Sequence, residues 1–419
     1  MQYTLTAPQQ LRGSIKLPAS KSISNRVLII HALTGSDELP QNLSDCDDTE
    51  VVIRALENNP YEIDIKAAGT AMRFMTAFLS VKAGEEHVIT GTERMKHRPI
   101  GILVDALRYI GADIEYAGDE GFPPLRINGS CLRGGKLEVS SSMSSQYISA
   151  LLLIGPMLTD GLELTLNGTV ISRPYIDLTL WTMREFGADA EWSDHNVISV
   201  KPGGYKGRSY YIENDWSAAS YWYEILALSN DEEAEIVLEG LTDGSKQGDS
   251  QLRYIFSLLG VKTTFCSTGE RGDASKTSVR LCRKQCSLQR LDYDFNGCPD
   301  LAQTFVVTCA MRGIPFRFDG LRTLRIKETD RIEALKAEML KLGYVIKNEG
   351  DDVLYWDGER TEPDSSMGID TYEDHRMAMA FAPAAFLVPG LRINNPEVVS
   401  KSYPQFWDHL RAVGFSIEY

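Results

Sequence analysis

The sequence predicts an α/β protein built from repeated units in two domains. Its 419 residues are more than one ordinary hydrophobic core accommodates, so two domains are expected. A phrase made of an apolar helix end, a glycine and an alternating strand also recurs along the chain. Five copies are present: LRYIGADIEY (107–116), TMREFGADAEW (182–192), FSLLGVKTTF (256–265), MLKLGYVIK (339–347) and LRAVGFSIEY (410–419).

The glycine of each copy is interpreted as the residue that ends a helix, where a left-handed conformation costs glycine least. These glycines recur every 71 to 83 residues. A degenerate earlier copy spans Ile53–Ile65, with Asn58 or Asn59 in the place of the glycine. Six units of about 70 residues, each with several strands and two helices, would account for the whole chain.

The composition is that of a soluble globular protein, with 43% hydrophobic and 24% charged residues. The first residues, MQYTLTAPQQ, resemble neither a signal nor a transit peptide, and the apolar runs are too short to span a bilayer, so a cytoplasmic location is expected. The seven cysteines lack paired spacings, which favours free thiols. The net charge of −15 disfavours nucleic acids and acidic membranes as partners. A site for anionic substrates must therefore concentrate basic residues locally.

Three predicted helices in the first half begin in segments rich in serine or glycine. The free N–H groups and the positive dipole end of such starts attract phosphate or carboxylate. Taken singly, plain N-capping explains most of them. Cations and an amide beside them, Lys21, Arg26, Arg73 and Gln146, favour anion binding. The segments are Leu17–Leu33 with Ser20, Ser22 or Ser24 as cap, Ala68–Val81 opening on Gly69 and Thr70, and Ser141–Leu158 opening on Ser144 and Ser145.

Further charged segments combine groups suited to anions and proton transfer. Ser22 and Arg26 would share one helix face, and Arg98 precedes a proline in a strongly basic stretch. Leu324–Leu335 is interpreted as a helix with Lys327 and Arg331 four residues apart, although a surface lattice of ion pairs would look the same. Later in the chain, His375 and Arg376 are expected at the start of a helix of small residues, and Lys401 precedes a loop that contains a proline.

Nine segments together closely resemble the 5-enolpyruvylshikimate-3-phosphate (EPSP) synthase family, in the same order along the whole chain. The resemblance implies two similar domains, each an inside-out α/β barrel of three βαβαββ units. They would comprise residues 17–213 and residues 1–16 with 214–419, and the active site would lie in the cleft between them. The segments are LPASKSISNR, AGTAMR, RMKHRPI, SSQY, ISRPYID, Pro299–Asp300, KETDR, DHRMAM and KSYP.

The same resemblance implies the reaction. The enolpyruvyl group of phosphoenolpyruvate would pass to the 5-hydroxyl of shikimate 3-phosphate, through a tetrahedral intermediate that loses phosphate. Guanidinium groups suit the donor because they pair with its carboxylate and phosphate. No metal or organic cofactor is implied. The expected partners are the two small-molecule substrates, with no nucleic acid and no membrane, and a monomer is expected.

Individual roles are carried over from the resemblance by position. Asp300 would orient or deprotonate the 5-hydroxyl, and Glu328 or Lys21 would protonate the methylene carbon. Shikimate 3-phosphate would be bound by Lys21, Ser22, Arg26, Ser144, Ser145, Gln146, Ser172, Tyr175, Asp300 and Lys327. Phosphoenolpyruvate would be bound by Lys21, Gly69, Arg98, Gln146, Arg331, Arg376 and Lys401.

The chain also departs from the family pattern and leaves two rival interpretations. Ala67, Phe74, His97 and Thr323 stand where the family usually has Asn, Pro, Glu and Asn, which bears on substrate contacts and on inhibition by glyphosate. The related UDP-N-acetylglucosamine enolpyruvyl transferases typically carry a reactive cysteine in their first half, and residues 90–98 contain none. A binding protein without catalysis would lack the proton-handling residues, which are all present here.

Overall fold

The computed structural model describes residues 1–140, 144–168, 170, 172–267, 277–364 and 368–419. The chain forms two compact units. The continuous unit comprises Ala19–Ile212, and the split unit comprises Met1–Pro18 with Glu213–Tyr419. Each unit has a hydrophobic core of its own. The chain passes from one unit to the other after Pro18 and again after Ile212.

The continuous unit contains two sheets with the same strand order among its described residues. Its elements are α1 (Lys21–Thr34), α2 (Asp47–Asn58), β3 (Glu62–Asp64), α3 (Gly69–Ser80), β4 (Glu86–Thr90), α4 (Glu93–Lys96), α5 (Gly101–Tyr109), β5 (Asp113–Tyr116), β6 (Leu125–Asn128), β7 (Gly135–Ser140), α6 (Ser145–Ile154), η1 (Gly155–Met157), β8 (Leu162–Asn167), α7 (Arg173–Glu185), β9 (Ala190–Asp194) and β10 (Val197–Val200). In the sheet β3-β4-β6-β5, the first two strands are parallel and the other pairs antiparallel. The sheet β7-β8-β10-β9 repeats this pattern.

The split unit repeats the same order twice more. Its elements are β1 (Gln2–Thr6), β2 (Arg12–Lys16), α8 (Trp216–Leu228), β11 (Glu235–Glu239), η2 (Gly248–Gln251), α9 (Leu252–Leu258), β12 (Val261–Ser267), β13 (Thr277–Arg283), β14 (Leu291–Asp294), η4 (Pro299–Leu301), α10 (Ala302–Met311), β15 (Phe316–Asp319), η5 (Arg322–Ile326), α11 (Arg331–Lys341), β16 (Lys347–Glu349), β17 (Val353–Trp356), α12 (His375–Phe381), η6 (Ala382–Phe386), β18 (Leu391–Asn394), η7 (Pro396–Lys401), α13 (Phe406–Ala412) and β19 (Ser416–Glu418). The sheets are β2-β11-β13-β12 and β14-β15-β17-β16. In a third sheet, the N-terminal strand β1 lies between β18 and β19.

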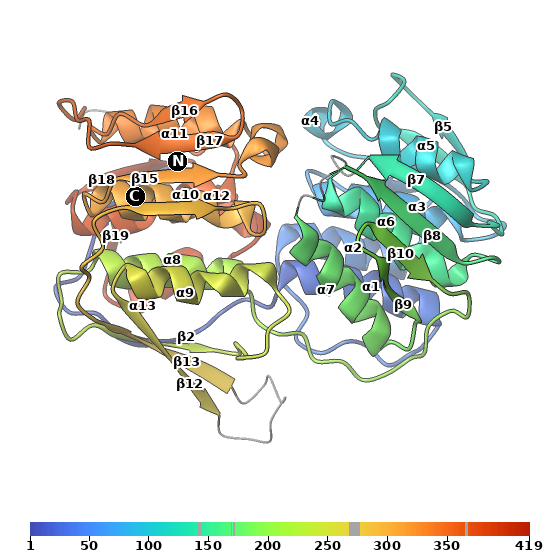
Figure 1. The fold of residues 1–419 in the computed structure, drawn as a ribbon, viewed down its shortest axis with the longest axis horizontal. Coiled ribbons are helices and arrows are strands. Elements are labelled where there is room, and N and C mark those ends of the chain that lie inside the picture. The colour runs from blue at the N-terminus through green and yellow to red at the C-terminus, as the bar shows by residue number, and fades with distance from the viewer. Residues whose placement is uncertain (141–143, 169, 171, 268–276, 365–367) are drawn as a thin grey trace. The chain divides into compact units, whose positions relative to one another are not determined.

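Several helices lie in the interior of each unit. All residues of α10 and α12 are buried, as are eleven of the twelve residues of α3. Strands such as β4 and β15 instead alternate between buried and less buried residues, as expected for sheets with one face on the core. Figure 1 shows α8 and α9 lying along one face of the sheet that contains β2, β12 and β13. The predicted α/β class is confirmed.

The helix–glycine–strand interpretation is confirmed at all five copies. Their glycines have φ between 82° and 105° and follow the ends of α5, α7, α9, α11 and α13. In the degenerate copy, Asn59 takes this place with φ 41°. A residue with a Cβ is strained in this region of φ, which explains why glycine occupies the other five positions.

One predicted helix is partly wrong. The segment Leu324–Leu335 was expected to be helical throughout, but α11 begins only at Arg331. Asp330 caps it by accepting hydrogen bonds from the N–H groups of Ile332 and Glu333, both at 3.2 Å. The preceding residues form the short 3-10 helix η5 and a loop. Because Asp330 satisfies the free N–H groups of a helix start, it ends the irregular segment there.

The three serine- or glycine-rich helix starts are confirmed where they are described. Helix α1 begins at Lys21 with Ser20 as cap, α3 begins at Gly69, and α6 begins at Ser145 with Ser144 as cap. Residues 141–143 and Ile171, which belong to predicted segments, lie outside the described residues.

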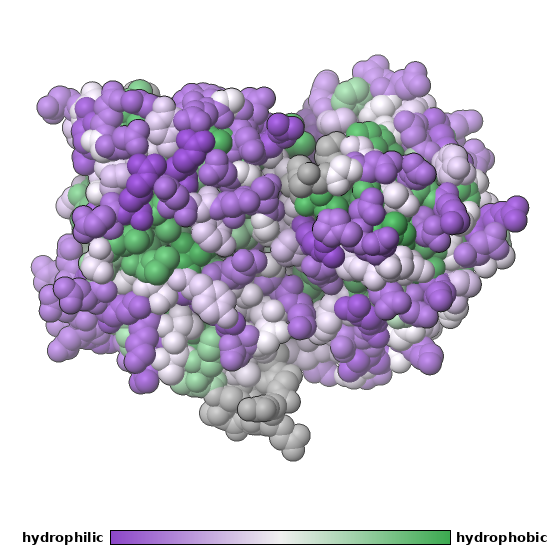
Figure 2. Space-filling view, viewed as in Figure 1, coloured by the Kyte–Doolittle hydropathy of each residue, from purple (hydrophilic) through white to green (hydrophobic). Residues whose placement is uncertain are grey.

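The expectation of free thiols is confirmed. All seven cysteines are free. The face seen in Figure 2 is mostly hydrophilic, with apolar side chains in scattered patches. In the part of the chain that the structure describes, no helix has both the length and the apolar character needed to cross a membrane.

Candidate active site

Arg331 is the centre of the charged cluster in the split unit. Its side chain is 1% exposed and lies at the first position of α11. Its Nε donates to Asp374 at 2.6 Å, Nη1 to Asp300 at 2.9 Å, and Nη2 to Glu328 at 2.8 Å. Burial alone would lower the pKa of Arg331, but these three carboxylates raise it above its ordinary value. The guanidinium therefore holds three acidic residues from three separate segments in a fixed arrangement.

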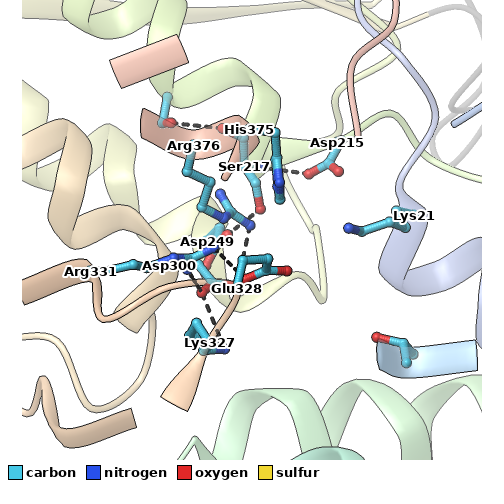
Figure 3. A network of polar contacts seen from close by, with 12 residues as sticks. Lys21, Asp215, Ser217, Asp249, Asp300, Lys327, Glu328, Arg331, His375 and Arg376 are labelled. Carbon is cyan, nitrogen blue, oxygen red and sulfur yellow. Dashed lines mark hydrogen bonds and ion pairs between the residues drawn. The ribbon is translucent and has the colours of Figure 1, made fainter. Parts of the chain in front are cut away.

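Asp300 accepts from three cations at once. Besides Arg331, its Oδ1 lies 3.3 Å from Nζ of Lys327, and its Oδ2 lies 3.2 Å from Nη2 of Arg376. Figure 3 shows these side chains converging on Asp300. Burial would raise the pKa of this carboxyl, but Arg376, Lys327 and Arg331 together hold it well below its usual range. Asp300 is therefore ionised, and both of its oxygens are paired with cations.

Glu328 is the second carboxylate that Arg331 holds. Its other oxygen, Oε1, lies 3.1 Å from Nζ of Lys401 at the end of η7. Lys327, in the loop before α11, thus pairs with Asp300. Glu328, in the same loop, pairs with Lys401, about 70 residues further along the chain. The sequence predicted Lys327 and Glu328 as site residues on a helix. The structure instead places both in the loop before α11, from which their side chains contact these partners.

Arg376 is positioned by the start of α12. Asp374 caps this helix by accepting from the Arg376 N–H at 2.9 Å, and the same carboxylate binds Arg331. Nη1 of Arg376 donates to the hydroxyl of Tyr221 on α8 at 3.4 Å. Burial raises the pKa of Tyr221 to about 12, so its hydroxyl stays protonated near neutral pH. His375 is 2% exposed, and its Nδ1 lies 3.7 Å from Asp374.

Sequence reasoning missed Asp249, a buried carboxylic acid beside this cluster. It is 3% exposed and accepts a hydrogen bond from the hydroxyl of Ser217. Burial raises the pKa of Asp249 to about 6, with Arg376 opposing the rise and Asp300 adding to it. The segment SKQGD, which leads into the short 3-10 helix η2 and ends on Asp249, has no distinctive charge or spacing in the sequence, so no local signal pointed to it. Figure 3 shows Asp249 next to Asp300 and Ser217.

In the continuous unit, Arg26 connects three helices. It is 3% exposed and donates from Nε to Thr179 at 2.7 Å, from Nη1 to the Ser22 carbonyl at 2.8 Å, and from Nη2 to Ser149 and to the Tyr175 carbonyl. Burial lowers the pKa of Arg26 to about 10, so it remains a cation at neutral pH. Four of its five N–H groups are thus used within this described unit, which leaves one on Nη1. Lys21, nearby on α1, pairs with Asp48 at 3.0 Å.

Gly69 allows Arg98 to lie against the start of α3. A Cβ at position 69 would come within 2.6 Å of Nη1 of Arg98, so only glycine leaves the guanidinium in place. Arg73, which the sequence grouped with the anion-binding cations, is instead 4% exposed and donates to the carbonyls of Gly69 and Pro99. Arg73 therefore supports the start of α3, against which Arg98 lies, and the backbone directly after Arg98.

Helix starts meet at this end of the continuous unit. Nε2 of Gln146 on α6 donates to the Thr70 hydroxyl on α3 at 3.2 Å. Arg26 bridges the first turns of α1 and α7. Ser172, which precedes α7, is 7% exposed and has φ 56°, an uncommon conformation for a serine. The structure therefore groups most of the predicted residues of this unit around the starts of α1, α3, α6 and α7, where backbone N–H groups favour anions.

Comparison with known proteins identifies the family. The sequence profile described as EPSP synthase (3-phosphoshikimate 1-carboxyvinyltransferase) matches residues 5–59 and 55–410, which is nearly the whole chain. The chain belongs to the EPSP synthase family. A 3-phosphoshikimate 1-carboxyvinyltransferase of Bacteroides fragilis (strain ATCC 25285) is 57% identical to it over 418 residues, covering 100% of this chain and 99% of the relative.

More distant relatives carry the same name. The 3-phosphoshikimate 1-carboxyvinyltransferase of Photobacterium profundum is 34% identical over 438 residues, with 97% of each chain covered. The EPSP synthase structure from Acinetobacter baumannii at 2.37 Å superposes with a TM-score of 0.77 over the full length of both chains, at 21% identity. At that identity the likeness supports the fold, and this member of the EPSP synthase family shares it.

Proposed function

We propose that this chain transfers the enolpyruvyl group of phosphoenolpyruvate to the 5-hydroxyl of shikimate 3-phosphate, with release of phosphate. The single observation that carries the proposal is the pair Asp300 and Glu328, joined by Arg331 at 2.9 and 2.8 Å. Such a reaction needs one group that accepts the hydroxyl proton and one that protonates the methylene carbon. Two carboxylates held about one guanidinium, with further cations beside them, supply both within one network.

Binding of phosphoenolpyruvate uses the cations that now neutralise these acids. Arg331, Arg376 and Lys401 are assigned to its carboxylate and phosphate, together with Arg98 and the Gly69 backbone from the continuous unit. Guanidinium forks bind such groups in a bidentate manner. A bound donor competes with Asp300 for Arg376 and Arg331, and each contact withdrawn from Asp300 raises the pKa of that carboxyl toward its usual value. Donor binding thereby makes Asp300 a better base.

The chemical steps then balance as an addition followed by an elimination. The 5-oxygen bonds to C2 of phosphoenolpyruvate while its proton passes to Asp300, and C3 receives a proton from the Lys21 ammonium or from Glu328 in its protonated, carboxylic acid form. From the tetrahedral intermediate, the C2–O bond to phosphate breaks and C3 returns a proton to the group that supplied it, which restores the vinyl double bond. The cations stabilise the negative charge on the departing phosphate.

The acceptor is assigned to the helix starts of the continuous unit. Ser144, Ser145, Gln146 and Ser172 offer hydroxyl, amide and backbone donors to the 3-phosphate, with Ser22, Tyr175 and Lys21 beside them. The free Nη1–H of Arg26 is directed to the same ligand, and Lys327 and Asp300 complete its contacts from the split unit. We further infer that the two units are the three-repeat, inside-out barrel domains expected for the family, that the active site forms in the cleft between them, and that the reaction uses no cofactor.

Phosphate release tests this function directly. Purified protein is given phosphoenolpyruvate with either shikimate 3-phosphate or UDP-N-acetylglucosamine as acceptor. Release that depends on shikimate 3-phosphate is the expected result. Release with the sugar nucleotide alone would assign the chain to the related transferases instead. Binding of shikimate 3-phosphate without release would indicate a binding protein.

A further inference from the structure

A strained turn lies directly before the residues that hold the centre of the charged cluster. Tyr372 and Glu373 have φ of 53° and 57°, so two consecutive residues with side chains adopt the left-handed conformation. A residue with a Cβ is disfavoured in this conformation, and it persists there only where its surroundings hold it. The next three residues are Asp374, which binds Arg331, then His375 and Arg376.

Glu338 on α11 holds this turn from the interior of the unit. It is 0% exposed, and its Oε1 accepts from the Tyr372 hydroxyl at 2.6 Å. Its Oε2 accepts from the backbone N–H of Asp370 at 3.0 Å and lies 2.7 Å from Nζ of Lys341. A buried carboxylate with three donors is well satisfied. Two of those donors belong to the segment that enters the turn.

The same helix holds both ends of the turn. Glu338 and Arg331 are seven residues apart on α11, which places them about two turns apart on one face. Glu338 binds Tyr372 and Asp370 on the near side, and Arg331 binds Asp374 on the far side. Any change in the conformation of residues 372 and 373 alters the distance between these two anchors, and α11 is a rigid element that resists it.

We propose that Glu338, acting through the Tyr372 hydroxyl, is a positioning residue that keeps this turn left-handed and so places Arg376 for phosphoenolpyruvate. The inference rests on the proposed function, because that function assigns Arg376 to the donor. Without the hydrogen bond, the turn relaxes toward ordinary φ values, and Asp374 no longer caps α12 in the position that directs Arg376 to Asp300. The acceptor contacts of the continuous unit do not depend on this turn.

Tyr372→Phe tests the proposal because it removes only the hydroxyl. We expect KM for phosphoenolpyruvate to rise about tenfold, which corresponds to the loss of one hydrogen bond to a charged group. KM for shikimate 3-phosphate is expected to stay within about twofold of the wild type. Tyr355→Phe on strand β17 is the matched control and should change neither constant. A fall in melting temperature with both KM values unchanged would overturn the proposal.

Tyr372→Gly distinguishes positioning from general packing. Glycine adopts positive φ without strain, so this variant loses the hydroxyl and also the strain at position 372 that would drive the turn to relax. Its KM for phosphoenolpyruvate should lie closer to the wild type than that of Tyr372→Phe, although more of the side chain is removed. The opposite order, with Gly worse than Phe, would contradict the proposal. If Tyr372→Phe does not fold, Glu338→Gln is compared with the wild type by the same measurements.

Amide hydrogen exchange separates this inference from the proposed function. Peptides covering residues 370–377 should exchange faster in Tyr372→Phe than in the wild type or in Tyr355→Phe. That result is independent of turnover. If the wild type releases no phosphate with shikimate 3-phosphate, the proposed function is wrong. If amide exchange in Tyr372→Phe is unchanged, Glu338 does not hold the turn.

Discussion

The two units hold their predicted site residues by different means. In the split unit, ionised side chains from the segments around residues 300, 328, 374 and 401 are bound to one another, with Arg331 at the centre. In the continuous unit, the starts of four helices are held by hydrogen bonds to carbonyls and hydroxyls, as in the contacts of Arg26 and Gln146. The predicted site residues of the split unit thus form a network of ion pairs. Those of the continuous unit surround helix starts, whose backbone dipoles favour anions.

This difference suits two kinds of ligand binding. Donors on helix starts are fixed by the backbone and are available without rearrangement, so they suit the phosphate that would remain unchanged in the proposed reaction. The paired charges of the split unit can exchange partners when an anion arrives, and this exchange changes the proton affinity of the carboxylates. The half that changes its charge state is therefore the half to which we assign the chemistry. Substitutions in either unit should break this contrast to different degrees.

Arg331→Met should destabilise the protein by about 3–5 kcal/mol, because it leaves buried carboxylates without their shared cation. Unfolding by urea, followed by fluorescence, measures the change. Arg317→Met is the matched control: Arg317 forms a bidentate pair with Glu349 at 2.8 Å on the surface, where solvent screens the charges, and its loss should change stability much less. Equal losses for the two variants would mean that burial of the network contributes little.

Glu328→Gln should lower kcat by about a hundredfold or more, because the variant cannot transfer a proton to the methylene carbon. The amide keeps the shape of the side chain, so binding of shikimate 3-phosphate, measured by calorimetry, should be close to that of the wild type. Near-normal turnover in this variant would remove Glu328 from the mechanism and leave Lys21 as the donor of that proton.

Gly69→Ala tests the framework of the continuous unit. The added Cβ would meet Nη1 of Arg98 at 2.6 Å, and the flexible arginine must move away. We expect KM for phosphoenolpyruvate to rise about tenfold through the displaced cation, with little change in stability. Gly244→Ala is the control, because a Cβ there meets nothing within 4 Å and φ is not positive. An unchanged KM would mean that Arg98 does not contact the donor.

Asp249→Asn tests whether a buried carboxyl group of the split unit changes its protonation between about pH 4 and about pH 6. The folded pKa of Asp249, about 6, is above the ordinary aspartate value, so the folded state keeps a proton that the unfolded state has lost. Wild-type stability should therefore fall relative to the variant as pH rises from about 4 to about 6, by at most about 1.4 kcal/mol per pH unit. Urea unfolding at several pH values measures both proteins. Parallel stability curves for the two would contradict the raised pKa.

The sequence predicted those parts of the structure that depend on neighbouring residues. Glycine at the end of a helix, serine at its start and alternation in a strand act within a few residues of one another. These signals therefore located the five helix–glycine–strand copies and the starts of α1, α3 and α6. The motifs themselves were sufficient for the family, because many specific segments occur in one order along the chain.

Only the tertiary structure decided which distant residues meet. Strand β1 pairs with β18, almost 390 residues later in the chain, and no local pattern encodes such a partner. Asp249 joins the cluster through burial and through Ser217, and Lys327 reaches Asp300 from a loop that local spacing suggested was a helix. The pKa of each carboxylate depends on desolvation and on the cations around it, both of which arise from packing. Sequence alone therefore determined the recurring helix ends, three helix starts and the family, whereas long-range packing determined the partners and charge states of the side chains.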